Sequence, residues 1–136
     1  MRGVVQRVSY AKVTVDKDVK GEINNGIMLL LGISNDDEDK DLEYIFDKVI
    51  NLRIFEDEEG KMNKSLLDVG GSILVVSQFT LQGDARKGRR PSFINAARPE
   101  KAINYYNKFI KKCQEKNIET KAGVFGAHMQ VELCND

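Results

Sequence analysis

The chain has 136 residues, of which 41% are hydrophobic and 31% are charged, with 21 basic and 21 acidic side chains. This composition is typical of a soluble globular protein, and the length predicts one domain with a core large enough to fold without disulfides. Two cysteines are too few for a disulfide scaffold, and the longest apolar run, 27–31, is far shorter than the roughly 18 residues of a membrane span. The first residues lead directly into strand-like sequence without a signal-peptide pattern, so we expect a cytoplasmic protein.

The first quarter of the chain predicts three strands. Recurring β-branched residues over 4–15 predict a strand, and a turn at 16–18 leads into a second strand over 19–23, which makes a hairpin. The tripeptide Asn24-Asn25-Gly26 predicts the next turn. The apolar run over 27–33 then predicts a buried strand.

An amphipathic helix is predicted after these strands. Asp36 and Asp37 are candidate N-caps, and the acidic residues that follow them suit the first turn of a helix because of the helix dipole. Apolar residues then recur at helical spacing, at Leu42, Ile45, Phe46, Val49 and Ile50. The segment therefore predicts a helix with one apolar face.

The second half predicts a similar mixture of elements. Short strands are predicted over 53–55 and 73–76, and residues 82–98 form a long basic loop without periodicity, a kind of segment that is usually functional or mobile. Pro99 suits the first turn of a second amphipathic helix, whose apolar residues are Ile103, Tyr106, Phe109, Ile110 and Cys113. Residues 120–125 and 128–133 predict two closing strands. The order of elements predicts an α+β domain with a mostly antiparallel, curled or barrel-like sheet and two amphipathic helices.

The charges are segregated along the chain. Residues 36–59 hold 11 acidic and 3 basic side chains, a net charge of −8, whereas residues 84–121 hold 4 acidic and 11 basic side chains, a net charge of +7. A chain with this pattern can present a basic face to an anionic partner while it stays neutral overall. The alternative is that both runs are solvated surfaces without a partner.

The pentapeptide Ser77-Gln78-Phe79-Thr80-Leu81 follows the apolar run 73–76. Its polar residues stand where a buried strand emerges, so they are candidates for groups that the edge of a sheet presents to a ligand. The alternative is that Ser and Thr at this position only satisfy nearby backbone groups.

The residues for several common kinds of catalysis are missing. His128 is the single histidine, so a Ser-His-Asp arrangement would have to use this residue. We expect it on a strand, where a lone histidine is more typical of a surface residue than of a catalyst. Cys113 falls in the apolar stripe of a helix, where thiols are usually inert. No metal-ligand spacing and no phosphate-binding glycine loop is present, so we expect neither a metal nor another cofactor.

Several further motifs accompany the pentapeptide. They are the segments 6–8, 52–55, 60–66, 83–93 and 125–129. In this order and spacing the chain resembles the D-aminoacyl-tRNA deacylases along its whole length. The resemblance implies hydrolysis of the ester between a D-amino acid, or glycine on the wrong tRNA, and the tRNA 3′ end. It implies a homodimer that binds aminoacyl-tRNA, without a membrane or DNA partner.

The resemblance also assigns roles to residues. Ser77, Gln78 and Phe79 would stabilise the oxyanion through backbone N–H groups, in a reaction assisted by the substrate's own ribose hydroxyl. Thr80 corresponds to the hydroxyl once favoured as nucleophile, but without a nearby base it would be a poor one, so we expect it to be a hydrogen-bonding group.

Other roles concern the substrate and the tRNA. Phe125, Gly126, Ala127 and Met129 would form the second wall of the pocket, although Phe125 and Met129 are also typical core residues. In the family an arginine that corresponds to Arg7 holds a Gly-Pro dipeptide, which enters the partner subunit's pocket and excludes L-amino acids. From sequence alone, Arg7 is equally typical of a strand surface. The residues expected to contact tRNA phosphates are Arg86, Lys87, Arg89 and Arg90.

One departure from the family pattern concerns the end of the sequence. The family's Gly-Pro directly follows an Asn-Asp like Asn135-Asp136, where this sequence stops. We therefore expect the single domain 1–136 to lack the family's last strand. The alternative function is a non-catalytic tRNA-binding module that has lost the chirality gate, and the length of the open reading frame discriminates between the two.

Overall fold

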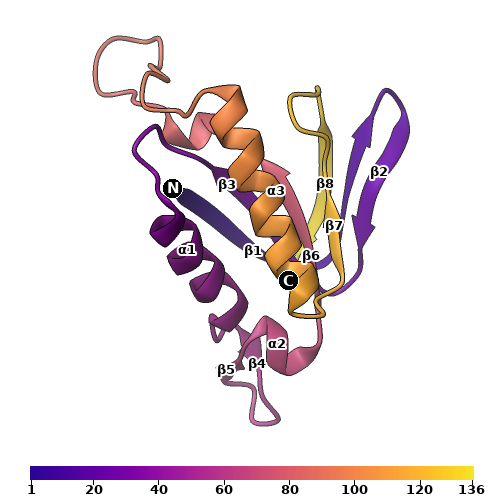
Figure 1. The fold of residues 1–136 in the computed structure, drawn as a ribbon. Helices are drawn as coiled ribbons and strands as arrows, with labels where there is room; N and C mark the ends of the chain where they lie inside the picture. The colour runs from indigo at the N-terminus through magenta and orange to yellow at the C-terminus, as the bar shows by residue number, and fades with distance from the viewer.

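The computed structural model describes residues 1–136 and shows a strongly curved sheet with two long helices packed on one face (Figure 1). The strands of this sheet are β1 (Arg2–Val15), β2 (Asp18–Ile23), β3 (Gly26–Gly32), β6 (Ser72–Ser77), β7 (Thr120–Ala122) and β8 (Gln130–Asn135). The long helices are α1 (Asp39–Asn51) and α3 (Pro99–Glu115). None of the helices combines the length and apolarity needed to cross a membrane.

The sheet runs in the order β2-β1-β3-β6-β7, with β8 paired to β1 as well. The pairings of β1 with β2, β3 and β8 are antiparallel, whereas β3–β6 and β6–β7 are parallel, so the sheet is mixed. The two edges approach each other at Gly21 of β2, where a Cβ atom would lie 2.7 Å from the carbonyl oxygen of Ala122 in β7. The sheet is therefore nearly closed, and the predicted α+β fold with a barrel-like sheet is confirmed.

Two apolar cores lie on opposite faces of the sheet. The larger core packs β3 and β6 against α1 and α3, with Phe46 and Phe109 in edge contact at a centroid distance of 5.6 Å. The smaller core fills the inside of the curl and includes Val8, Met28 and Leu74. Burial on both faces explains why β3 and β6 are continuous apolar runs rather than alternating ones.

The N-terminus of α1 lies later than the sequence predicts. Glu38, rather than Asp36 or Asp37, is the N-cap residue, and its backbone N–H donates to the side chain of Asp41 at 2.8 Å. Asp37 is buried and forms an ion pair with the α-amino group of Met1 at 2.5 Å, and it also accepts a hydrogen bond from the backbone N–H of Ser34. These partners lie far away in sequence or in a loop, so capping preferences do not reveal them.

Three smaller elements complete the fold. A short hairpin pairs β4 (Phe55–Glu56) with β5 (Met62–Lys64), and the one-turn helix α2 (Leu66–Val69) follows it. Helix α2 is absent from the predicted elements, although Ser65 and Asp68 form the reciprocal capping contacts that identify a helix start. The closing strands are also displaced from their predicted ranges, because residues 123–129 form a loop between β7 and β8.

Candidate active site

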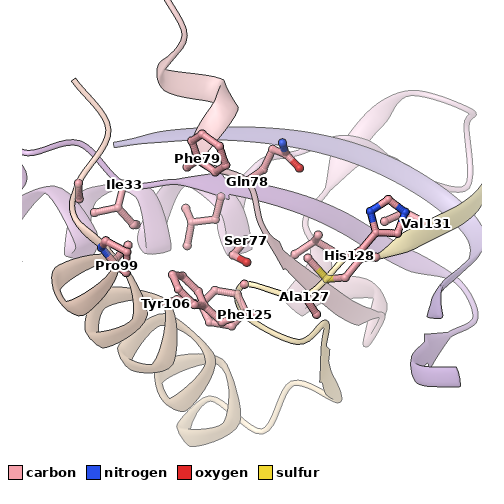
Figure 2. Close-up of a pocket in the computed structure, with 16 residues that line it drawn as sticks. Ile33, Ser77, Gln78, Phe79, Pro99, Tyr106, Phe125, Ala127, His128 and Val131 are labelled. Carbon is pink, nitrogen blue, oxygen red and sulfur yellow. The ribbon is translucent and has the colours of Figure 1, made fainter. Parts of the chain in front are cut away.

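A pocket of about 530 Å³ opens where β6 ends and the 3₁₀ helix η1 (Phe79–Gln82) begins (Figure 2). The end of β6 and the start of η1 contribute Ser77, Gln78 and Phe79, and α3 contributes Tyr106. The opposite wall is the loop 125–129. Eleven of the sixteen lining residues are hydrophobic, so the pocket suits a ligand with a substantial apolar surface.

Unpaired backbone N–H groups lie at the start of η1, beside this pocket. Phe79 and Thr80 are the first two residues of η1, so neither N–H has a partner within the helix, and neither forms any other hydrogen bond. The N–H of Ser77 points to the β7 side, as those of Ile73 and Val75 do by strand alternation, but β7 already ends at Ala122. The site thus offers several backbone donors at one place.

The pentapeptide residues do not all match their expected roles. The backbone N–H of Gln78 donates to the carbonyl oxygen of Leu31 at 2.9 Å, so this amide is occupied in the sheet. The side-chain amide of Gln78 donates instead to the hydroxyl of Thr80. Free amides are therefore those of Ser77, Phe79 and Thr80, rather than the predicted set of Ser77, Gln78 and Phe79.

No side chain near Thr80 is placed to act as its base. The hydroxyl of Thr80 contacts only the Gln78 side chain, and the residue is exposed. Tyr106 lies in the pocket, but its hydroxyl donates to the carbonyl oxygen of Val75 at 2.8 Å, and burial raises the pKa of this phenol to about 12. No cluster of three or more His, Cys, Asp or Glu side chains is arranged to hold a metal ion.

The loop 125–129 lines the side of the pocket opposite η1. Phe125 lies against Tyr106 at a centroid distance of 6.0 Å, and Gly126 has φ = 77°, a conformation that favours glycine. Phe125 and Met129 also pack against the larger and smaller cores respectively, so they are core residues and pocket residues at once. His128 lines the pocket too, on a loop rather than the predicted strand, and it is not among the predicted site residues.

Arg7 is not among the residues that line this pocket. Its guanidinium donates to the backbone carbonyl oxygens of Asp136, at 2.5 Å, and of Ile54, at 2.8 Å. The N–H of Asp136 returns a bond to the carbonyl of Arg7 at 3.1 Å. Arg7 is thus half-buried and anchors the backbone beside Asn135-Asp136 instead of forming a free strand surface.

The basic side chains of residues 84–121 fall into two groups, those paired with acidic side chains and those without an ion-pair partner. Lys108 and Lys112 on α3 form ion pairs with Asp39 and Glu43 on α1, so much of the charge on the two helices is neutralised within the molecule. In the loop between η1 and α3, Arg86 is held by Asp84. Lys87, Arg89 and Arg90 are exposed and have no ion-pair partner, and the first and last of them border a second, polar pocket of about 570 Å³.

The sequence of this chain matches the family model described as D-Tyr-tRNA(Tyr) deacylase over residues 4–136. The chain belongs to this family. A D-aminoacyl-tRNA deacylase of Clostridioides difficile (strain 630) is 60% identical over all of this chain and 91% of its own length. The protein of the same name from Brevibacillus brevis is 58% identical over all of this chain and 94% of its own length.

Two solved structures share the fold of this chain. A structure titled c-Myc DNA Unwinding Element Binding Protein aligns with a TM-score of 0.94 and 46% identity, over 100% of this chain and 93% of the other. A probable eukaryotic D-amino acid tRNA deacylase aligns with a TM-score of 0.84 over 98% and 93% of the two chains. At 16% identity, the second match supports the fold only.

Proposed function

We propose that this protein hydrolyses the ester bond of D-aminoacyl-tRNA and releases the free amino acid and tRNA. The observation that carries the proposal is the group of unpaired backbone N–H donors at Phe79 and Thr80, beside a largely apolar pocket and without a conventional nucleophile and base. Family membership supplies the substrate class. The same chemistry would act on glycine attached to the wrong tRNA.

The reaction needs little from the protein's side chains. A water oxygen attacks the ester carbonyl, and the negative charge of the tetrahedral intermediate is stabilised by hydrogen bonds from the free amides at the start of η1. Losing one such donor typically costs about 10²–10³ in rate. The bond between the carbonyl carbon and the ribose oxygen then breaks, and that oxygen takes up the proton that the attacking water has released through the neighbouring ribose hydroxyl. In this proposal the neighbouring ribose hydroxyl orients or activates the water, because Thr80 has no base beside it and no carboxylate accompanies His128 in the lining of the pocket.

The side chains of Ser77, Gln78 and Thr80 act in this proposal as supporting groups. The Gln78 side chain fixes the Thr80 hydroxyl, and the Gln78 N–H ties the start of η1 to β3 through Leu31. Phe125, Gly126, Ala127 and Met129 enclose the side of the substrate opposite the amides. No metal or cofactor takes part.

We further propose that the protein acts in the cytoplasm as a homodimer and binds tRNA rather than DNA. Arg7 lies outside the pocket of its own chain and fixes the backbone next to Asn135-Asp136, which suits a residue that supports a segment entering the partner's pocket. The unpaired cations Lys87, Arg89 and Arg90 favour a phosphate backbone as ligand, and Arg86 contributes to the same charged loop.

The test of the mechanism is a pair of D-tyrosyl-tRNA substrates that end in adenosine or in 2′-deoxyadenosine, each charged on the 3′ hydroxyl. We expect the deoxy substrate to be hydrolysed very poorly, whereas binding of the two tRNAs should be similar. Equal hydrolysis of both substrates would refute substrate assistance, and hydrolysis of neither would refute the proposed activity.

A further inference from the structure

Two aromatic rings form a fixed pair at the edge of the candidate active site. The ring of Phe79 lies in edge contact with that of Phe93, with centroids 5.2 Å apart and planes at 75°. Phe93 also packs against Gly83, where a Cβ atom would lie only 2.9 Å from the ring. Phe79 is 56% exposed, so its ring is not buried in the hydrophobic core and is accessible to a ligand. Its position at the start of η1 places it beside the unpaired amides.

The same two rings lie next to the ends of the cationic loop, which is formed by residues 84–92. Asp84 and Ser92 join the two ends of this loop by reciprocal backbone hydrogen bonds of 2.8 Å each, and Phe93 follows directly. Arg86 donates to both carboxylate oxygens of Asp84 and so stiffens the loop instead of offering a free charge. Aromatic surface and unpaired cations are therefore held on one continuous, closed segment.

We propose that Phe79 and Phe93 form a stacking platform for an unpaired base in the single-stranded 3′ end of the tRNA, upstream of the terminal nucleotide. Lys87 and Arg90 would then lie on the path of the adjoining phosphates. This proposal rests on the proposed function, because the ester must lie at the free amides. Alternating aromatic and cationic groups are the usual surface for single-stranded nucleic acid, because every base offers a face for stacking and every linkage a charge.

A fluorescence measurement on the unmodified protein tests this platform directly. The probe is an uncharged tRNA with 2-aminopurine at the penultimate position, whose fluorescence is quenched when the base stacks. The platform predicts a change in fluorescence at saturating protein that differs from that of a probe placed inside the acceptor stem. Identical responses from the two probes would overturn the proposal.

A kinetic measurement separates stacking from a structural role. In Phe93→Leu we expect kcat/KM for D-tyrosyl-tRNA to fall roughly 5- to 100-fold relative to kcat/KM for D-tyrosyl-adenosine, which has no upstream base. The fall should appear mainly in KM, and Phe93→Trp should restore it. Tyr44→Leu is the matched control, since Tyr44 is an aromatic residue that is 63% exposed on α1, away from the loop.

The outcomes distinguish this proposal from the proposed function. Equal loss on both substrates in Phe93→Leu would show that the residue only supports the pocket, and would overturn the platform. If the unmodified protein hydrolyses neither substrate, the proposed function itself fails, whereas the quenching measurement still reports on the platform.

Discussion

At the scale of single residues, the candidate site depends on where backbone amides are left free. The sheet takes the N–H of Gln78, whereas η1 leaves those of Phe79 and Thr80 unpaired. The side chains at the same positions mainly hold this backbone in place. Substitutions that keep the backbone path should therefore be milder than removal of a catalytic nucleophile.

Thr80→Ala should test this view. The hydroxyl accepts a hydrogen bond from Gln78 and has no base beside it, so we expect kcat to fall by less than about 100-fold, below the effect of losing one oxyanion donor. Single-turnover hydrolysis of D-tyrosyl-tRNA measures the effect, with Thr80→Ser as the matched control. Trapping of a covalent aminoacyl adduct on Thr80 would restore the nucleophile hypothesis.

Asp84 provides a pH prediction for the cationic loop. Hydrogen bonds from Arg86 lower the pKa of this carboxyl to about 2, below the value of about 3.9 in an unfolded chain. The ionised pair therefore stabilises the closed loop above about pH 4, and this contribution is lost as the pH falls toward 2. Carboxyl carbon shifts followed by NMR should titrate near this value, and in Arg86→Ala the titration should move up toward pH 4. An unshifted titration in the intact protein would contradict the pairing.

At the scale of elements, periodicity explains which parts of the fold the sequence predicts. Strands β3 and β6 are buried on both faces, and α1 and α3 have one apolar face, so hydrophobic patterns locate all four. The short helix α2 and the loop 123–129 have no such pattern, and they were missed or predicted as strand.

The candidate site is only partly predictable for the same reason. The pentapeptide stands out because polar residues follow a buried strand. The occupied amide of Gln78 depends on the register of β6 with β3, and the contact between Phe79 and Phe93 depends on the path of a long loop. His128 reaches the pocket only because β8 begins at Gln130. Such contacts between distant segments leave no local pattern in the sequence.

Gly32 gives a prediction about how β3 supports η1. A Cβ atom there would lie 2.8 Å from the carbonyl oxygen of Gln78 and 2.9 Å from Cβ of Leu81. Gly32→Ala should therefore displace η1 and its free amides, lowering the free energy of unfolding by about 1–3 kcal/mol and kcat by at least roughly 10-fold.

The matched control for this substitution is Gly88→Ala. Gly88 has φ = 67° and nothing within 4 Å of an added Cβ, so we expect a cost of only about 1 kcal/mol and an unaltered η1. Denaturant unfolding and single-turnover kinetics measure both effects. Equal kcat values for the two variants would show that Gly32 does not position η1.

At the scale of the whole molecule, the neutral chain separates its charges into a neutralised body and a cationic loop. Asp39 and Glu43 of α1 pair with Lys108 and Lys112 of α3, whereas Lys87, Arg89 and Arg90 of the loop have no ion-pair partner, so on our proposal the loop binds phosphates. The affinity for tRNA should fall by about 0.7–0.9 log units per log unit of salt for each phosphate neutralised.

Charge substitutions test this division. Replacing Arg86, Lys87, Arg89 and Arg90 together with Ala should flatten the salt dependence of tRNA binding. The double variant Lys108→Ala, Lys112→Ala is the matched control, because its lost charges are already paired with α1 and the slope should change little. An unchanged slope in the quadruple variant would exclude the loop as the phosphate-binding surface.

The central claim is that this molecule is an ester hydrolase for D-aminoacyl-tRNA. The most direct measurement is release of tyrosine from D-tyrosyl-tRNA and from L-tyrosyl-tRNA, compared with spontaneous hydrolysis of each in buffer without added metal. The account predicts release from the D substrate well above its spontaneous rate, with L-tyrosyl-tRNA measured in parallel as the comparison for chirality. Release from D-tyrosyl-tRNA at the spontaneous rate, despite measurable tRNA binding, would contradict it and favour the non-catalytic binding module.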